Sequence, residues 1–215
     1  GSVRASKYLK NVIPLSVHIC ITTKDILYEG PYIQIIGFKV LSRNPFQFLG
    51  NDTNQKILPE EMKNKVKSSS ISLALYAKKL GYRGILGVDF LWDKDSNRVF
   101  AQEINSRLVG LTRLLTGIQK EQKIVPHLIR HLNEFISPLS LEGYSNKPLN
   151  LSNYDYSQVY IANNKDSVIE VKQHLLPGIY KIMNGNLIRT KNSLFLSDME
   201  ENQVLINFSA HKGSK

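Results

Sequence analysis

The chain has 215 residues, of which 42% are hydrophobic and 21% are charged. This composition is typical of a globular protein that is long enough to bury a core, either as one large domain or as two small ones. No apolar run approaches the roughly 18 residues of a membrane span. A single cysteine, Cys20, excludes an internal disulfide and zinc-type cysteine spacing, and we expect a reducing, cytoplasmic setting.

The formal net charge of +10 at pH 7 is compatible with a nucleic-acid partner, because basic surfaces bind phosphate backbones. The basic residues are, however, spread along the chain. The densest run, at Lys63, Lys65 and Lys67, follows Glu60 and Glu61 on a predicted helix. Nucleic-acid binding is therefore an alternative function that would require the lysines and arginines to converge on one face.

The first third of the chain alternates strand and turn signals. Residues 15–21 and 32–40 are typical of strands, and residues 26–28 predict a short strand between them. A polar loop follows, and Pro59 then begins a long helix that Gly81 ends.

The segment from 81 to 107 predicts a β-hairpin, because two apolar runs flank the polar turn-forming residues 94–97. If the strands fold symmetrically about Ser96, Asp89 lies opposite Glu103, and Asn105 shares their face. A register slip of one residue would break this pairing. The other face is expected to pack into the core through five apolar residues: Val88, Phe90, Trp92, Phe100 and Ile104.

Two carboxylates that face each other across a sheet repel, and a cation between them would remove this repulsion. Carboxylate and amide oxygens are the hard ligands that Mg²⁺ takes when it also holds phosphates. We therefore interpret Asp89, Glu103 and Asn105 as candidate metal ligands. The alternative is a solvated hairpin face, which explains Asp93 and Asp95 at the tip better than it explains Glu103 and Asn105.

The remaining elements suggest a second unit. Helices are expected at 111–119 and 124–136, and a linker rich in Ser, Asn, Pro and Gly at 138–155. Short strand-like runs follow, which favour a small barrel or sandwich. They lie at 159–162, 168–171, 179–182, 187–189, 194–196 and 204–208. The predicted organisation is a domain at 3–137, the linker at 138–155 and a mostly-β domain at 156–215.

The G-V-D-F run at 87–90, the hairpin and the E-I-N-S-R run at 103–107 resemble the C-terminal lobe of an ATP-grasp carboxylate–amine ligase. Weaker matches precede them, in order, at 16–19, 34–37 and 50–51, so that the resemblance covers roughly residues 3–137. The resemblance implies an α+β fold in which an antiparallel sheet and helices form that lobe and a small mostly-β domain follows it.

The resemblance also implies roles for individual residues. Asp89, Glu103 and Asn105 would coordinate Mg²⁺ (or Mn²⁺) that bridges the phosphates of ATP. Arg107 would be both the catalytic residue and a cofactor-binding residue, because it would hold phosphate or the acyl-phosphate intermediate.

Ser16 and His18 alternate on the strand at 15–21 and are candidates to face the nucleotide. A purely structural role is the alternative for His18, because it is a lone histidine on a strand. His127 and His131 have the spacing of a helical metal pair, but no acidic third ligand lies near them in the sequence.

The last 60 residues, with L-P-G-I-Y at 176–180 and Q-V-L-I-N at 203–207, resemble the small β-domain that trails pheganomycin-type peptide ligases. The expected function is therefore part of an ADP-forming, ATP-dependent ligase that forms peptide bonds through an acyl phosphate. ATP and carboxylate or amine substrates are the expected partners.

The segment before residue 15 is too short for the lobe that holds the rest of the nucleotide. The chain is thus expected to be the C-terminal portion of a longer ligase, inactive without its N-terminal lobes. The alternative from another class is a non-catalytic binding module that keeps the fold.

Overall fold

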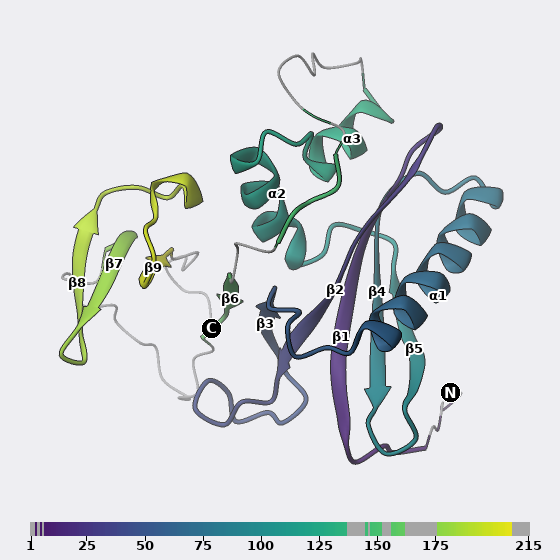
Figure 1. The fold of residues 1–215 in the computed structure, drawn as a ribbon, viewed down its shortest axis with the longest axis horizontal. Helices are drawn as coiled ribbons and strands as arrows, with labels where there is room; N and C mark the ends of the chain where they lie inside the picture. The colour runs from purple at the N-terminus through teal and green to yellow at the C-terminus, as the bar shows by residue number, and fades with distance from the viewer. Residues whose placement is uncertain are drawn as a thin grey trace.

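In the part of the chain that the structure describes, two antiparallel sheets and three α-helices form an α+β fold (Figure 1), as the sequence predicted. The structure is a computed structural model, and it describes residues 3, 5, 7–136, 145, 147–151, 156–161 and 176–207. None of the helices in these ranges is long and apolar enough to cross a membrane.

The larger sheet has six strands in the order β5-β4-β1-β2-β3-β6, and each neighbouring pair is antiparallel. The two central strands, β1 and β4, pair along their whole length, so they fix which residues share a face. The strands are β1 Val12–Ile21, β2 Ile26–Ile36, β3 Phe48–Asp52, β4 Gly84–Asp93, β5 Arg98–Asn105 and β6 Ser157–Val159.

Helix α1 (Glu60–Lys79) covers one face of this sheet (Figure 1). Acidic residues in its first turn and lysines in its last turn complement the helix dipole. Met62 and Val66 are fully buried against apolar side chains of β1 and β4. Tyr76 and Leu80 are exposed although they are large and apolar. The buried stripe runs through positions 62, 66, 70 and 74 and leaves them on the outer side.

Strand β2 is one continuous element, whereas the sequence predicted two strands with a break at 29–31. Gly30 and Pro31 lie within the strand, at a register shift where two residues oppose the single residue Val17 of β1. A proline lacks a backbone donor and is tolerated in a strand at such a bulge. The glycine and proline that predicted a turn at 29–31 therefore mark a bulge within one strand.

Helices α2 (Leu111–Glu121) and α3 (His127–Asn133) lie on the other face of the sheet (Figure 1). Four apolar residues of α2 form a second core cluster with Tyr32 of β2. The helix predicted at 124–136 begins only after Pro126, because Ile124 instead forms an isolated bridge with Ser145.

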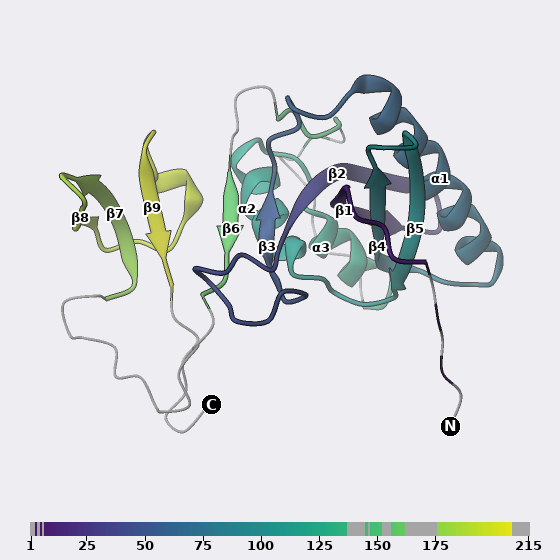
Figure 2. The ribbon, with the colours of Figure 1, turned by 90° about the horizontal axis from the view of Figure 1, so that it is seen from below.

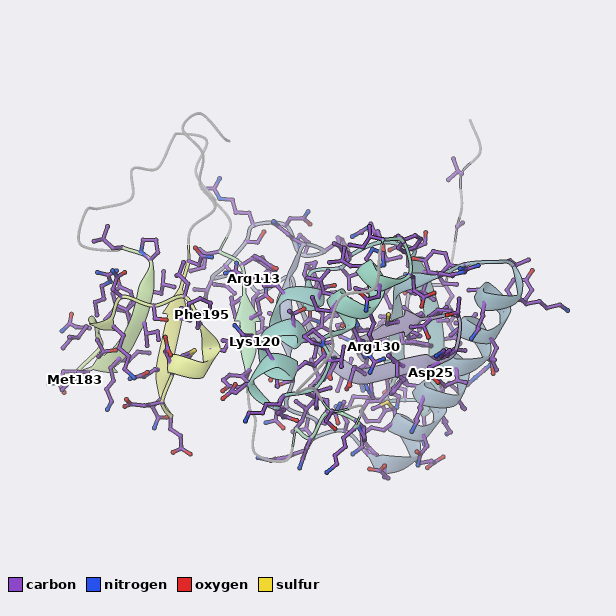
Figure 3. The ribbon with its side chains drawn as sticks, turned by 90° about the horizontal axis from the view of Figure 1, so that it is seen from above. Asp25, Arg113, Lys120, Arg130, Met183 and Phe195 are labelled. Atoms are coloured by element: carbon purple, nitrogen blue, oxygen red, sulfur yellow. The ribbon has the colours of Figure 1, made fainter. Side chains whose placement is uncertain are left out.

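A separate three-stranded sheet has the order β8-β7-β9 (Figure 2). Its strands are β7 Gly178–Met183, β8 Asn186–Lys191 and β9 Gln203–Ile206, and the short 3-10 helix η1 (Leu196–Asp198) precedes β9. Leu196 packs against α2, and the Lys120 ammonium lies 5.1 Å from the centre of the Phe195 ring (Figure 3). The connection before β9 thus contacts the helices of the larger sheet, and the strand expected at 194–196 is absent there.

Strand β6, which the sequence assigned to the trailing β-domain, instead pairs with β3 in the larger sheet. The strand predicted at 168–171 lies outside the described residues, as do positions 137–144, 146 and 152–155 of the linker region. The described part of that region, at Leu149 and Leu151, packs against the α2 cluster. The division into domains at 138–155 stays a prediction.

Packing of α1 on the sheet should dominate stability. Met62→Ala removes a fully buried side chain and should lower the free energy of unfolding by about 2–5 kcal/mol. Leu75→Ala, on the exposed side of the same helix, should change it by less than about 0.5 kcal/mol. Urea denaturation of both variants measures the difference, and equal losses would contradict this account of the core.

Candidate functional site

The hairpin of β4 and β5 brings the two predicted acids together. Asp89 pairs with Glu103, and Gly87 pairs with Asn105, which confirms the predicted pairing at this end of the hairpin. Nearer the turn the register differs by one residue from a symmetric fold about Ser96, since Asp93 pairs with Arg98. A bulge beyond Asp89 adds the missing residue on β5 and restores the pairing.

The bulge changes which β5 side chains face the core. Phe100 pairs with Leu91 and therefore lies on the Asp89 face, where the Arg98 guanidinium lies 5.2 Å from the centre of its ring. Val99 takes the expected core position against Trp92. The prediction for Phe100 was wrong because alternation was counted through the bulge without the extra residue. Ile104 pairs with buried Val88, but it is half exposed because β5 is the edge strand.

A row of polar side chains crosses the sheet on the face opposite α1. Ser16 of β1 pairs with Asp89 of β4, and the Asn51 side-chain amide donates to the Ser16 hydroxyl at 2.8 Å. The Gln34 amide donates to Asp89 Oδ1, also at 2.8 Å. Strands β1, β2, β3 and β4 thus each contribute one polar group to a contiguous row. Gln34 and Asn51 lie in two of the stretches on which the family resemblance rests. Only the order of the strands in the sheet shows that Gln34 meets Asp89 and that Asn51 meets Ser16.

Asn105 and Arg107 extend this row beyond Asp89. The Asn105 amide donates to Asp89 Oδ2 at 3.1 Å, and Arg107 Nη2 donates to the Asn105 side-chain oxygen at 3.0 Å. Arg107 also donates to the Leu108 carbonyl and stays exposed. Four of the predicted site residues, Asp89, Glu103, Asn105 and Arg107, therefore gather at one edge of the sheet.

The electrostatics of Asp89 are unfavourable for a carboxylate. Burial and then the charge of Glu103 raise the pKa of Asp89 above its usual value, and hydrogen bonds from Asn105 and Gln34 and the charge of Arg107 only partly offset this. A cation at this position would be stabilised by both carboxylates. The residues therefore fit the metal that the sequence suggested.

The donor set would leave room for other ligands. In the part of the chain that the structure describes, no three His, Cys, Asp or Glu residues gather as metal ligands. Asp89 and Glu103 would supply two carboxylates, and the Asn105 oxygen keeps a second lone pair beside its bond from Arg107. Mg²⁺ commonly takes one or two carboxylates and fills its remaining positions with water and phosphate oxygens.

His18 occupies a different environment from Ser16, although both lie on the same face of β1. It is fully buried beneath α2 and α3, with its ring nitrogens 3.1 Å from His127 Nδ1 and 3.1 Å from Thr112 Oγ1. A nucleotide could contact His18 only if these helices moved. The arrangement ties the sheet to both helices, and a role for His18 in nucleotide binding stays a prediction.

Both imidazoles are neutral in this environment. Burial and then the neighbouring His127 hold the pKa of His18 well below its usual value. Burial and then the charge of Arg130 lower the pKa of His127 to about 3. His131, the other half of the predicted helical pair, accepts a hydrogen bond from the backbone of Ile85 and does not meet His127 at a shared site.

No protein-family model and no curated protein matches this chain. Among solved structures, it is similar over 63% of its length to carboxyaminoimidazole ribonucleotide synthase from Aspergillus clavatus complexed with ATP, with 16% identity and a TM-score of 0.44. Biotin carboxylase from Campylobacter jejuni matches 64% of the chain, with 21% identity and a TM-score of 0.46. Pyruvate carboxylase from Rhizobium etli matches 65%, with 16% identity and a TM-score of 0.47.

Each similarity covers only part of this chain and only part of the compared enzyme. The aligned region makes up 32%, 28% and 13% of the three enzymes in the order given, so the chain spans less than a third of the length of each of them. Identities and TM-scores at this level describe a partial likeness of fold. The chemistry of the site follows from the residues of this chain.

Repulsion between Asp89 and Glu103 should lower the stability of the metal-free protein. Because the pKa of Asp89 is raised, its neutral form contributes stability at low pH, and this contribution is lost as the pH rises through that pKa and the two carboxylates begin to repel each other. Glu103→Gln should raise the free energy of unfolding at pH 7 by a few tenths to about 1 kcal/mol. Urea denaturation in EDTA measures the change.

Glu201→Gln is the matched control, because it removes the same charge at an exposed position of the smaller sheet. It should leave stability unchanged. A loss of stability in Glu103→Gln would mean that Glu103 makes structural contacts that outweigh the repulsion.

The buried histidine pair makes a prediction about pH. His127 should not take up a proton at pH 5 in the folded protein, and the pKa of His18 should lie below the value near 6.5 that both histidines have in urea. Their contribution to stability is therefore complete above about pH 6.5 and falls as the pH drops from the unfolded towards the folded pKa, by at most about 1.4 kcal/mol per pH unit for each histidine. Nitrogen NMR of the imidazoles measures the charge, and a His127 that is cationic at pH 5 would contradict the burial described above.

Proposed function

We propose that the face around Asp89, Glu103, Asn105 and Arg107 is the metal-and-phosphate half of the nucleotide site in an ATP-dependent carboxylate–amine ligase. The observation that carries this proposal is the pairing of Asp89 with Glu103 on adjacent strands, beside an amide and an arginine. A structural surface gains nothing from two facing acids, one of which is half-buried with a raised pKa. A site for a cation and phosphates gains from this arrangement.

Mg²⁺ or Mn²⁺, held by Asp89, Glu103 and Asn105, would neutralise phosphate charge when bound. Gln34 and Asn105 each donate to one oxygen of Asp89 and so fix the orientation of its carboxylate. Positioning and charge neutralisation are most of what a protein must supply for phosphoryl transfer.

Arg107 is the residue that would act directly on the reacting groups. Its guanidinium is exposed beside Asn105, and its donors that are not used by Asn105 and Leu108 can meet an anion from solvent. A planar guanidinium suits both the transferred phosphoryl group and the oxygens of an acyl phosphate. An amine would then displace phosphate from that acyl phosphate to form an amide, which is a peptide bond if both substrates are amino acids or peptides.

The proposal includes parts beyond this chain. Further lobes of the same ligase would supply the remaining phosphate ligands and much of the substrate specificity. The smaller sheet, in the region that resembles the trailing domain of pheganomycin-type ligases, would be an accessory to the reaction. Without those lobes we expect weak nucleotide binding and no ligation.

Cation binding tests the proposal on this chain directly. Mn²⁺ added to the isotope-labelled protein should broaden the amide signals of residues near Asp89, Glu103 and Asn105 first, because paramagnetic broadening falls steeply with distance. Glu103→Gln should weaken the effect at least about tenfold, since one of two carboxylates is lost. Glu201→Gln should behave as wild type.

The same two variants, placed in the ligase with its N-terminal lobes, separate catalysis from binding alone. Glu103→Gln should lower the rate of ADP release at least about a hundredfold, a typical loss when a group that stabilises the transition state is removed. Glu201→Gln should keep the wild-type rate. Site-specific Mn²⁺ binding without any ATP-dependent turnover would instead identify a non-catalytic binding module.

A further inference from the structure

A cavity lies at the opposite end of β2 from the polar row around Asp89. Its volume is about 290 Å³, and it is lined by the first residues of β2, the middle of α1, the segment 124–130 and residues 147–148. It shares no residue with the candidate nucleotide site. The groups that give it chemistry are Tyr28, Glu29, Lys67, Arg130 and Lys147.

The cavity exists because β3 covers only part of β2. Strand β3 pairs with β2 over Ile33–Ile36, and within the described ranges no strand pairs with the outer edge of residues 26–29. Helix α1 lies on one side of this edge, and the segment from Ile124 to Arg130 lies on the other. Side chains on both faces of β2 therefore line one space.

Tyr28 leaves a polar group unsatisfied beside this space. Its hydroxyl is buried and has no hydrogen-bond partner in the structure. Buried polar atoms almost always have partners, and an unpaired one costs about 1–3 kcal/mol. This hydroxyl has almost no accessible surface, so a molecule in the cavity would not reach it, and Tyr28 lines the cavity through its other atoms.

The charge in the cavity is predominantly positive. Lys67, Arg130 and Lys147 line it, and the Lys67 ammonium lies 5.9 Å from the centre of the Tyr28 ring. Among the described residues that line it, Glu29 is the only acidic one. Burial raises the pKa of Glu29 to about 7, against the opposing hydrogen bonds from the Leu149 backbone and Tyr32, so its carboxyl is partly neutral near physiological pH.

We propose that this cavity binds a small organic anion, whose carboxylate or phosphate group pairs with Lys67, Arg130 and Lys147. The ligand is small because the cavity holds about 290 Å³. The site is independent of the proposed nucleotide site, since the two share no side chain.

Titration with inorganic phosphate and, separately, with citrate tests the proposal and distinguishes the two anion types. Saturable shifts of the NMR signals of Tyr28, Lys67 and Arg130 are expected with at least one anion. A response to phosphate alone would assign a phosphate-bearing ligand, and a response to citrate alone would assign a polycarboxylate. The absence of saturable shifts at these residues with both anions would overturn the proposal.

Two variants show whether binding is local. Lys67→Gln and Lys147→Gln should each weaken binding about threefold to fivefold, as expected for one partly exposed charge. Lys79→Gln makes the same charge change at an exposed position on the same helix and should have no effect. Equal weakening by Lys67→Gln and Lys79→Gln would show attraction to net charge only and would refute the site.

Asp89→Asn separates this inference from the proposed function. It should abolish site-specific Mn²⁺ broadening and leave anion binding at Tyr28 and Lys67 unchanged. Loss of anion binding in Asp89→Asn would place the anion at the polar row and contradict a second site.

Discussion

The antiparallel pairing of β1 with β4 is the constraint on which the rest of the molecule depends. These two central strands must bury their alternating apolar residues, among them Leu15, Val17, Val88 and Phe90, against α1. Since successive side chains point to opposite faces, burial of these residues forces Ser16 and Asp89 to the other face. The same hydrophobic contact that stabilises the sheet therefore presents a carboxylate in the middle of its second face.

That second face has two ends with different chemistry. At one end α2 and α3 close over His18, and the imidazoles are neutral because burial disfavours their charged forms. At the other end, no helix among the described residues covers Asp89, and its neighbours are amides and hydroxyls that tolerate or orient charge. The helices thus bury one half of the face, and the proposed site lies on the other half.

The polar row is a feature that a protein selected only for stability would not keep. Facing acids on β4 and β5 destabilise the metal-free sheet, and Gln34 and Asn105 reduce this cost without removing it. Violations of packing rules concentrate at functional sites, where the unfavourable term disappears on binding. The Tyr28 hydroxyl, which is buried without a hydrogen-bond partner, is a second unfavourable feature.

The sequence by itself determined the local elements: the long helix that Gly81 ends, the hairpin at 84–105 and the pairing of Asp89 with Glu103. Each depends on periodicity or turn residues within a few positions, which a chain displays directly. Tertiary structure alone decided the continuity of β2 through Pro31, the bulge that moved Phe100 to the Asp89 face, and the burial of His18. It also brought Gln34 to Asp89 and Asn51 to Ser16, because such contacts depend on which strands become neighbours, and local alternation carries no information about strand order.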